Sequence, residues 1–301
     1  VVVDTGAKLH LLGSDVKGNA SAGVGITAAR HGAVVVRNSQ INDNGHAGVY
    51  VCDGGNAHLV GVHLARNGLA GVAAVGGANP TVQNCNVYEN MGCGVLIMEG
   101  GGGQMVRSEV RANVMSGIAV KGENSRLRVV DSIIKDGLDA GVFVHDGATC
   151  TLKGCAIQHN KLAGVASGEG GFPELEDCDI HKCRVGVSGF NAGLGSLERC
   201  DIYGNLVANV SIETRAKLTL RRCKLRDGNG VGMLVERGGM AKMTTCTVSG
   251  NRLPGVIVRD VDSNPEFEDN QIVDNHGLGV YLSDACAPSF HTGEVSRNGG
   301  V

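Results

Sequence analysis

Eleven cysteines and ten histidines are the residues of this sequence with the most evident capacity for chemistry. Thiolates and imidazoles can ligate a metal ion or form a nucleophile–base pair, but both uses require close, specific spacings. The sequence contains no C-x-x-C pair, no H-E-x-x-H motif and no nucleophile-elbow pattern. It therefore predicts no catalytic residue, no metal site and no cofactor.

Six of the cysteines share one position of a repeat. They are Cys85, Cys155, Cys178, Cys200, Cys223 and Cys246. Other copies of the repeat hold serine, valine, asparagine or glycine there, so the position requires a small inward side chain, and a thiol meets that need as a small hydrophobic group. A long run of thiols with an odd total fits a reducing compartment better than disulfides. We therefore predict buried, reduced thiols and a cytoplasmic location.

The elements that position these side chains belong to an internal repeat of about 23 residues. A Gly-Val dipeptide or a near relative returns at spacings of 22 to 24 residues. Its first residues are Gly25, Gly48, Gly71, Gly94, Gly117, Gly141, Gly164, Gly186, Asn209, Gly232, Gly255 and Gly279. A second anchor, apolar-x-x-Cys-x-apolar-x-x-Asn, is clearest at residues 152–160. Two anchors that keep their register along the whole chain indicate a repeat architecture.

The two anchors predict short strands. Gly-Val-x-Val alternates apolar residues with a period of two, and turn residues bound the second anchor. The sequence has 48 glycines, no tryptophan and only 3% aromatic residues, so the core cannot depend on rings. We predict an all-β fold, a right-handed single-stranded parallel β-helix of about 12 coils. Residues 1–301 would form one β-helix domain without a linker, and because both ends fall inside repeats we expect a fragment of a longer chain.

An asparagine closes most copies of the second anchor. The column runs through Asn44, Asn67, Asn90, Asn113, Asn160, Asn205, Asn251, Asn275 and Asn298. Asparagine tolerates left-handed backbone, and its amide can satisfy backbone groups of the adjacent coil. We interpret the column as a structural ladder. It is interrupted at Gly137, Cys183 and Gly228. At Gly137 and Gly228 the glycine also permits left-handed backbone.

The residue between the two apolar positions of Gly-Val-x-Val points outward. In the first half of the chain this column alternates large and small side chains, from Thr27 and Tyr50 through Ala73 and Leu96 to Phe143. Two interpretations remain open. The bulky side chains could cover their small neighbours, or they could form an apolar strip that binds a protein partner through Tyr50, Leu96 and Phe143.

Charge is arranged in bands rather than as one field. Alignment of the repeats places Glu198 beside Arg221 and Asp201 beside Lys224, which predicts solvated ion pairs between coils, with a site for an acidic partner as the alternative. The net charge of −3 indicates no nucleic-acid partner. No run of 18 apolar residues exists, so no membrane-spanning segment is predicted.

The repeat resembles that of the carbohydrate-binding and sugar-hydrolase β-helix superfamily. The segments Gly76–Val82 and Asp262–Phe267 make it most similar to the substrate-recognition β-helix of F-box ubiquitin-ligase subunits and related adaptors. This resemblance implies a non-catalytic protein-binding or structural scaffold, acting alone or within a larger assembly. The chain departs from those subunits in having no helical F-box segment and no Cys/His zinc module.

The alternative function is a polysaccharide-processing enzyme (a lyase, hydrolase or C5-epimerase) or a carbohydrate-binding β-helix. Such enzymes need clustered carboxylates and aromatic platforms for sugar rings. The nearest candidates are Asp260 and Asp262 with Arg259, and His145 with Asp146. Neither group matches the D-P-H-[DE] pattern associated with epimerases. On this basis the sequence favours the scaffold.

Overall fold

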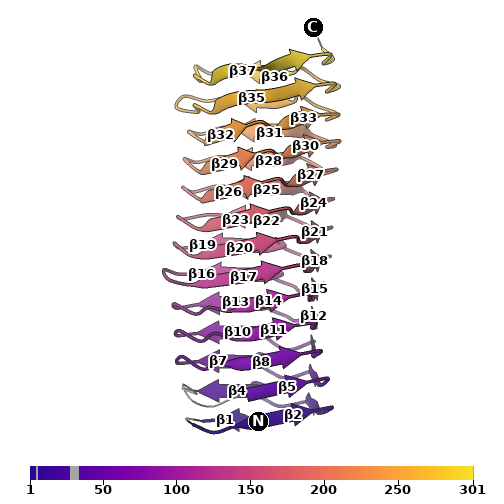
Figure 1. Cartoon of the computed structure of the whole chain (residues 1–301), viewed down its shortest axis with the longest axis vertical. Helices are drawn as coiled ribbons and strands as arrows, with labels where there is room; N and C mark the ends of the chain where they lie inside the picture. The colour runs from indigo at the N-terminus through magenta and orange to yellow at the C-terminus, as the bar shows by residue number, and fades with distance from the viewer. Residues whose placement is uncertain (5, 28–33, 301) are drawn as a thin grey trace. The chain divides into compact units, whose positions relative to one another are not determined.

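A computed structural model describes residues 1–4, 6–27 and 34–300. It confirms the predicted architecture, an all-β right-handed parallel solenoid of about 13 turns with a period of about 23 residues. The described residues contain no helix, and so none that could span a membrane. The chain divides into two compact units, Val1–Ala156 (unit 1) and Ile157–Val301 (unit 2). Within each unit, strands of successive turns stack on one another (Figure 1).

Unit 1 is built from three columns of parallel strands. The first column is β1 (Val2–Val3), β4 (Val24–Thr27), β7 (Val49–Cys52), β10 (Val72–Val75), β13 (Val95–Met98), β16 (Ile118–Lys121) and β19 (Val142–His145). The second column is β2 (Leu9–Leu12), β5 (Val34–Arg37), β8 (Ala57–Val60), β11 (Thr81–Gln83), β14 (Gln104–Val106), β17 (Arg126–Val130) and β20 (Thr149–Lys153). The third is β3 (Asp15–Lys17), β6 (Gln40–Asn42), β9 (His63–Ala65), β12 (Asn86–Tyr88), β15 (Glu109–Arg111) and β18 (Ile133–Lys135).

Unit 2 repeats the three columns. β21 (Ala156–Gln158) runs from the last residue of unit 1 into unit 2. The first column is β22 (Ala163–Ser167), β25 (Val185–Gly189), β28 (Ala208–Ile212), β31 (Val231–Val235), β34 (Val256–Val258) and β36 (Val280–Leu282). The second column is β23 (Phe172–Glu176), β26 (Leu194–Glu198), β29 (Lys217–Arg221) and β32 (Met240–Thr244). The third column is β24 (Asp179–His181), β27 (Asp201–Tyr203), β30 (Lys224–Arg226) and β33 (Thr247–Ser249). The long strands β35 (Glu266–Val273) and β37 (Ser289–Ser296) serve both columns.

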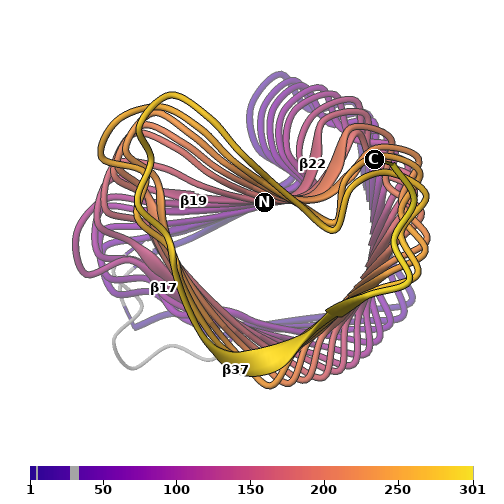
Figure 2. The same cartoon turned by 90° about the horizontal axis from the view of Figure 1, so that it is seen from above.

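The apolar core lies inside the turns. In β10, Val72 and Ala74 are fully buried, and they lie in register with Val95 and Ile97 of the next turn. Each strand therefore buries its inner residues against the residues at the equivalent repeat positions of the neighbouring strands, as expected for stacked repeats. Seen along the stacking direction, the backbones of successive turns within a unit nearly superimpose (Figure 2). Such regular stacking brings side chains that are one period apart in sequence into contact.

A glycine precedes the first strand of most turns because no side chain fits there. A Cβ atom on Gly71 would lie 2.3 Å from Val87 Cγ1 and 2.8 Å from Gly94 O. The first repeat corrects the sequence alignment. Gly25 lies opposite Tyr50, so the crowded position belongs to Gly23, and the member of the outward column in this turn is Gly25 rather than Thr27.

This crowding predicts a difference between two glycine-to-alanine substitutions. Gly71→Ala should destabilise the fold by about 1–3 kcal/mol, because the methyl group must displace a packed side chain or a backbone carbonyl. Gly25→Ala is the matched control, since the nearest atom to its Cβ, Val1 O, is 3.9 Å away. Urea unfolding of both variants measures the difference. Equal unfolding midpoints would show that the packing around Gly71 is looser than described.

The predicted asparagine ladder is present inside the turns. In unit 1, Asn44 Nδ2 donates to Asn67 Oδ1 (3.0 Å), Asn67 to Asn90 (2.9 Å) and Asn90 to Asn113 (3.0 Å). Each amide also donates to the carbonyl of an adjacent turn, as Asn90 does to Leu64 O (3.2 Å). The ladder therefore satisfies backbone groups that face the dry interior.

The prediction that the ladder asparagines adopt a left-handed backbone is wrong. The left-handed residue is the one before each asparagine, such as Asp43 (φ 57°) or Glu89 (φ 55°), while the ladder asparagines themselves do not have positive φ. Gly137 and Gly228 also lack positive φ. The corner is made one residue earlier, which leaves the asparagine free to point its amide inward.

The interruption at Gly228 is repaired by a residue from another column. Asn209, which stands where other repeats have glycine, accepts from Asn205 Nδ2 (2.9 Å) and donates to Asn251 Oδ1 (2.9 Å). A Cβ atom on Gly228 would lie 3.0 Å from Asn209 Nδ2. The asparagine at 209 thus occupies the space that an asparagine at 228 would fill, so the two departures from the repeat compensate each other.

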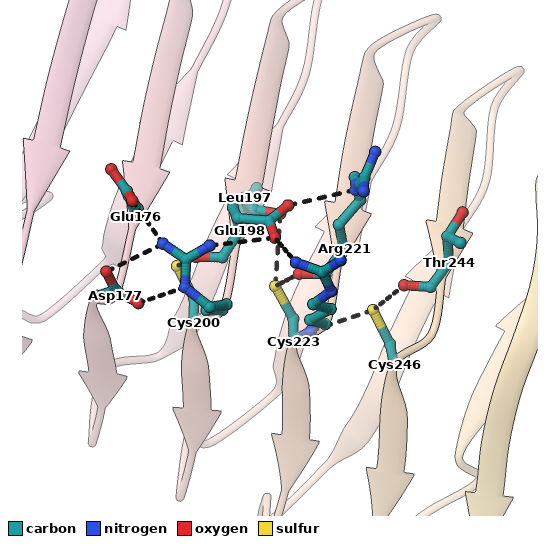
Figure 3. A network of polar contacts seen from close by, with 11 residues as sticks. Glu176, Asp177, Leu197, Glu198, Cys200, Arg221, Cys223, Thr244 and Cys246 are labelled. Atoms are coloured by element: carbon teal, nitrogen blue, oxygen red, sulfur yellow. Dashed lines mark hydrogen bonds and ion pairs between the residues drawn. The ribbon is translucent and has the colours of Figure 1, made fainter.

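The cysteine column forms a buried stack, as predicted. In unit 2, Cys200, Cys223 and Cys246 are reduced and at most 1% exposed, and Cys223 N donates to Cys246 Sγ (3.3 Å; Figure 3). Their thiols also donate to carbonyls two residues earlier, as Cys246 Sγ does to Thr244 O (3.3 Å). In unit 1, burial raises the pKa of the column thiol Cys85. The cytoplasmic location inferred from these thiols stays a prediction.

Burial predicts low reactivity of the column thiols. In the native protein, a soluble aromatic disulfide reagent should label the half-buried Cys52 and Cys286 first, and should reach the column thiols only after unfolding. Mass spectrometry of labelled peptides identifies the sites, and the urea-unfolded protein supplies the fully labelled reference. Rapid native labelling of Cys200 or Cys223 would contradict the burial of the column.

Candidate active site

The outer face of the third strand column in unit 2 carries a row of aromatic and basic side chains. On β24, β27 and β30 the middle residues Ile180, Ile202 and Leu225 are buried in the core. Their neighbours along the strand therefore point outward. The parallel register aligns His181, Tyr203 and Arg226 in one row, with Asp179, Asp201 and Lys224 in a second row.

The three side chains of the first row form a continuous stack. The rings of His181 and Tyr203 are 4.6 Å apart with an interplanar angle of 10°. The guanidinium of Arg226 covers the other face of Tyr203, with its Cζ 4.4 Å from the ring centroid. His159 meets His181 edge-on at 6.0 Å. Because its faces are covered, Tyr203 offers its edge and hydroxyl group, beside the edges of the imidazole and the guanidinium.

Carboxylates hold the arginine of the stack in place. Arg226 donates to Asp201 through Nε (2.9 Å) and Nη2 (2.8 Å), and to Asp227 through Nη1 (2.6 Å). The sequence predicts a pair of Asp201 with Lys224 instead. The planar guanidinium lying on Tyr203 binds Asp201 in bidentate fashion, which a lysine cannot do. Among the described residues Lys224 has no ion-pair partner, and it is exposed.

The surroundings favour the neutral form of both rings of the stack. Burial, followed by the charges of Lys182 and His159, lowers the pKa of His181, against the opposing effect of Asp179 and Asp201. His181 Nδ1 is buried and has no hydrogen-bond partner in the described chain. Burial and the same two carboxylates raise the pKa of Tyr203.

This arrangement has the parts needed to remove a proton next to a carboxylate group. A neutral imidazole can accept the proton, a phenol can donate one, and cations can stabilise the negative charge that develops between the two steps. All three kinds of group lie side by side on one face, on consecutive turns. No other cluster described below combines them in this way.

The residues predicted to bind a partner lie on the first strand column of unit 1. Tyr50 and Leu96 pack against Ala73, which is only 4% exposed, and they line a shallow hollow of about 250 Å³. The lateral-packing interpretation is thus confirmed for these two residues. Phe143 is separated from Leu96 by Ala119, and its ring stacks on His145 at 4.3 Å. A partner-binding role for the three residues stays a prediction.

The two carboxylate groups considered from the sequence do not form comparable sites. Arg259 pairs with Glu236. Asp260 instead accepts a hydrogen bond from Arg237 N (3.0 Å). His145 Nδ1 lies 3.0 Å from Asp146 Oδ2. These contacts lie between neighbouring turns or adjacent residues, and none of them places an imidazole beside a phenol and a guanidinium.

The predicted charge bands form a surface network in unit 2. Glu198 lies 3.3 Å from Arg221 and 3.2 Å from Arg222, which confirms the predicted alignment of Glu198 with Arg221. Arg199 bridges Glu198 (3.3 Å) to Asp177 (2.7 Å). Exposed pairs of this kind contribute less than about 1 kcal/mol each. They are consistent with stabilising contacts between turns.

Inspection of the sequence for compact motifs missed His181, Tyr203 and Arg226. Each follows directly after the buried aliphatic residue of the second anchor, and they are 22 and 23 residues apart. That spacing is the period of the repeat, so the three had to share one outward row. Reading the residues of each row in order, rather than searching for local motifs, would have found them.

Comparison with protein families and solved structures places this geometry in context. The model of the right-handed β-helix region matches residues 1–131, 116–272 and 212–301. The chain belongs to the right-handed β-helix family. The predicted repeat is thereby confirmed, whereas the likeness to F-box adaptors stays a prediction. None of the curated proteins matches the chain.

Solved structures that resemble this β-helix include polysaccharide epimerases. The A-module of the Azotobacter vinelandii mannuronan C-5 epimerase AlgE6 is 13% identical, with 97% of this chain and 91% of that module covered and a TM-score of 0.53. The AlgE4 A-module is 14% identical, with 96% and 91% covered and a TM-score of 0.53. A variant of the periplasmic alginate epimerase AlgG is 12% identical, with 95% and 77% covered and a TM-score of 0.53. At these identities the likeness is one of fold.

These relatives correct the functional expectation. The predicted non-catalytic protein-binding or structural scaffold is wrong, because the comparisons favour the polysaccharide-processing alternative. The sequence argument failed because it required clustered carboxylates and exposed sugar platforms. The candidate site described above instead places its imidazole, phenol and guanidinium on successive turns, with Asp179 and Asp201 in the adjacent row.

Proposed function

We propose that this β-helix cleaves a 4-linked uronic-acid polysaccharide by β-elimination at the outer face of β24, β27 and β30. The observation that carries the proposal is the stack of His181, Tyr203 and Arg226, 4.6 Å and 4.4 Å apart. The polymer would lie along the face, across successive turns. Lys224 and Arg226 would bind the carboxylate of one uronate residue and offset the charge that forms there.

The reaction assigns one proton transfer to each ring. Neutral His181 removes the C5 proton of the uronate, and the electrons of the C5–H bond move into the carboxylate to form an enediolate. The enediolate collapses to a C4–C5 double bond as the C4–O4 bond breaks, and Tyr203 gives its proton to O4, the reducing-end oxygen of the neighbouring sugar. The imidazolium and phenolate then exchange a proton, which restores both groups.

The placement of the two rings favours cleavage over C5 inversion. Inversion requires a base and an acid on opposite faces of the sugar, whereas His181 and Tyr203 approach from one side. Elimination from one side requires C5–H and O4 on the same face of the ring, as in manno- and gluco-configured uronates. Galacturonate and guluronate place them on opposite faces. The preferred substrates are therefore mannuronate or glucuronate polymers.

Incubation of the purified protein with single-uronate polymers tests the proposal. Polymannuronate or a 4-linked glucuronan should yield oligosaccharides with an unsaturated end, detected by ultraviolet absorbance and mass spectrometry. Polyguluronate and polygalacturonate should be cleaved much more slowly. Inversion at C5 without chain cleavage would contradict the one-sided mechanism, and the absence of any product from all four polymers would contradict the function.

A further inference from the structure

We infer that unit 1 carries a second, non-catalytic uronate-binding site at Tyr88, Arg111 and Lys135. The inference rests on the proposed function for the identity of the ligand. These residues occupy the same outward row of the third strand column as the stack of unit 2. They lie in register on β12, β15 and β18. Arg111 covers the ring of Tyr88, with its Cζ 4.1 Å from the centroid.

The cations of this row are held loosely enough to accept another carboxylate. Arg111 Nε lies 3.1 Å from Glu109, and Lys135 Nζ lies 3.4 Å from the same carboxylate oxygen. Glu89 is 3.7 Å from Arg111. One carboxylate, Glu109, thus makes the shorter contacts to both cations. All four side chains are at least 28% exposed, so solvent screens these pairs and a polymer carboxylate can compete for them.

A polar hollow adjoins the row and suits the hydroxyl groups of a sugar. Its volume is about 330 Å³, at the lower end of the roughly 300–1,000 Å³ typical of small-ligand sites. It is lined by Asn84, Asn86, Arg107, Ser108, Glu109, Asp131 and Ile133. Its lining includes amide and guanidinium donors and carboxylate acceptors. Glu109, which lies in the other outward row in register with Asn86 and Ile133, lines the hollow and contacts both cations. Sugar hydroxyls require both kinds of partner.

The group that would take a proton is missing from this row. Ala65 stands opposite Tyr88, in the place that His181 takes opposite Tyr203. His63 is on the same strand as Ala65, but it lies opposite Asn86 in the other outward row. No imidazole stacks on Tyr88 within the described residues. Unit 1 therefore has cations and hydrogen-bonding groups for a uronate but lacks the stacked base, so it would hold the polymer without cleaving it.

Calorimetric binding of a mannuronate hexamer tests the site apart from catalysis. The full chain would carry His181→Gln, Lys224→Gln and Arg226→Gln, so that the ligand persists and the cations of the face of β24, β27 and β30 no longer bind it. Adding Arg111→Gln and Lys135→Gln should weaken the affinity at least tenfold. The matched control adds Arg126→Gln and Arg128→Gln, which remove the same charge from exposed positions of β17 outside the hollow, and should change the affinity less than twofold. Thermal unfolding establishes that each variant is folded.

The outcomes separate the two proposals. Equal affinity with and without Arg111 and Lys135, or no hexamer binding by the chain that keeps both residues, overturns the second site even if the wild type cleaves polymannuronate. Hexamer binding that depends on Arg111 and Lys135 supports the second site even if the wild type cleaves no uronate polymer. That last result would refute the proposed elimination while leaving a uronate-binding β-helix.

Discussion

Replacing His181 with glutamine should lower the rate of polymannuronate cleavage by about 10²–10⁴-fold, the usual contribution of a positioned general base. Glutamine keeps a planar polar group on Tyr203 but cannot take the C5 proton. The initial rate of unsaturated product formation measures the loss. His291→Gln is the control, since His291 is an exposed histidine of unit 2 on β37, and its rate should match the wild type.

Tyr203→Phe should separate the two proton transfers. The phenyl ring can still stack between His181 and Arg226, so the base and the cation keep their places. Without the hydroxyl group, O4 leaves slowly, while His181 still removes the C5 proton reversibly. In deuterated water the variant should therefore exchange the C5 hydrogen faster than it cleaves the chain. If exchange and cleavage fall together, Tyr203 is not the acid.

The pH dependence of cleavage should follow the neutral form of His181. Since burial, Lys182 and His159 lower its pKa below the ordinary value of about 6.5, activity should persist below neutrality and fall only as the pH drops through that lowered pKa. Tyr203, whose pKa is raised, stays protonated through the neutral range. A rate that rises on acidification from pH 7 would require a protonated imidazole and would exclude His181 as the base.

The fold could be predicted from the sequence because one period governs the whole chain. Each repeat buries its inner residues only against its neighbours, so the spacing of Gly-Val and of the second anchor specifies the stacking directly. The sequence alignment took Gly25 instead of Gly23 as the crowded glycine, and this error has a local cause. The first repeat is longer than the others, and two glycines, Gly23 and Gly25, satisfy the pattern equally well in sequence. Only the space around each Cβ atom distinguishes them.

The candidate site could not be predicted by the same search. Its residues, His181, Tyr203 and Arg226, form no local motif, because their neighbours in space are one full repeat away in sequence. The lowered pKa of His181 arises from burial and from charges on adjacent turns, which composition does not reveal. Asp201 pairs with Arg226 and not with the predicted Lys224, because the planar guanidinium of Arg226 lies on Tyr203. Such preferences depend on side-chain geometry rather than on position in the repeat.

The compensation between Asn209 and Gly228 can be tested by exchanging the two residues. Asn209→Gly alone removes the amide that bridges Asn205 and Asn251, which leaves buried polar groups unpaired and should cost on the order of 2–4 kcal/mol. Gly228→Asn alone introduces a side chain into space held by Asn209 and its partner Asn251, whose Nδ2 and Oδ1 would be 3.0 Å and 2.8 Å from the new Cβ. It should also destabilise the protein, by about 1–3 kcal/mol.

The double variant should recover most of the lost stability. Asn209→Gly restores the glycine found at that position in other repeats, and Gly228→Asn restores the ladder residue, whose backbone asparagine can adopt because Gly228 lacks positive φ. Urea unfolding of the four proteins gives the coupling energy directly. We expect the double variant to lie within about 1 kcal/mol of the wild type, a favourable coupling that independent sites do not show. Additive losses would mean that Asn209 is not the substitute for a missing rung, and that the ladder is interrupted in unit 2 rather than continued by another column.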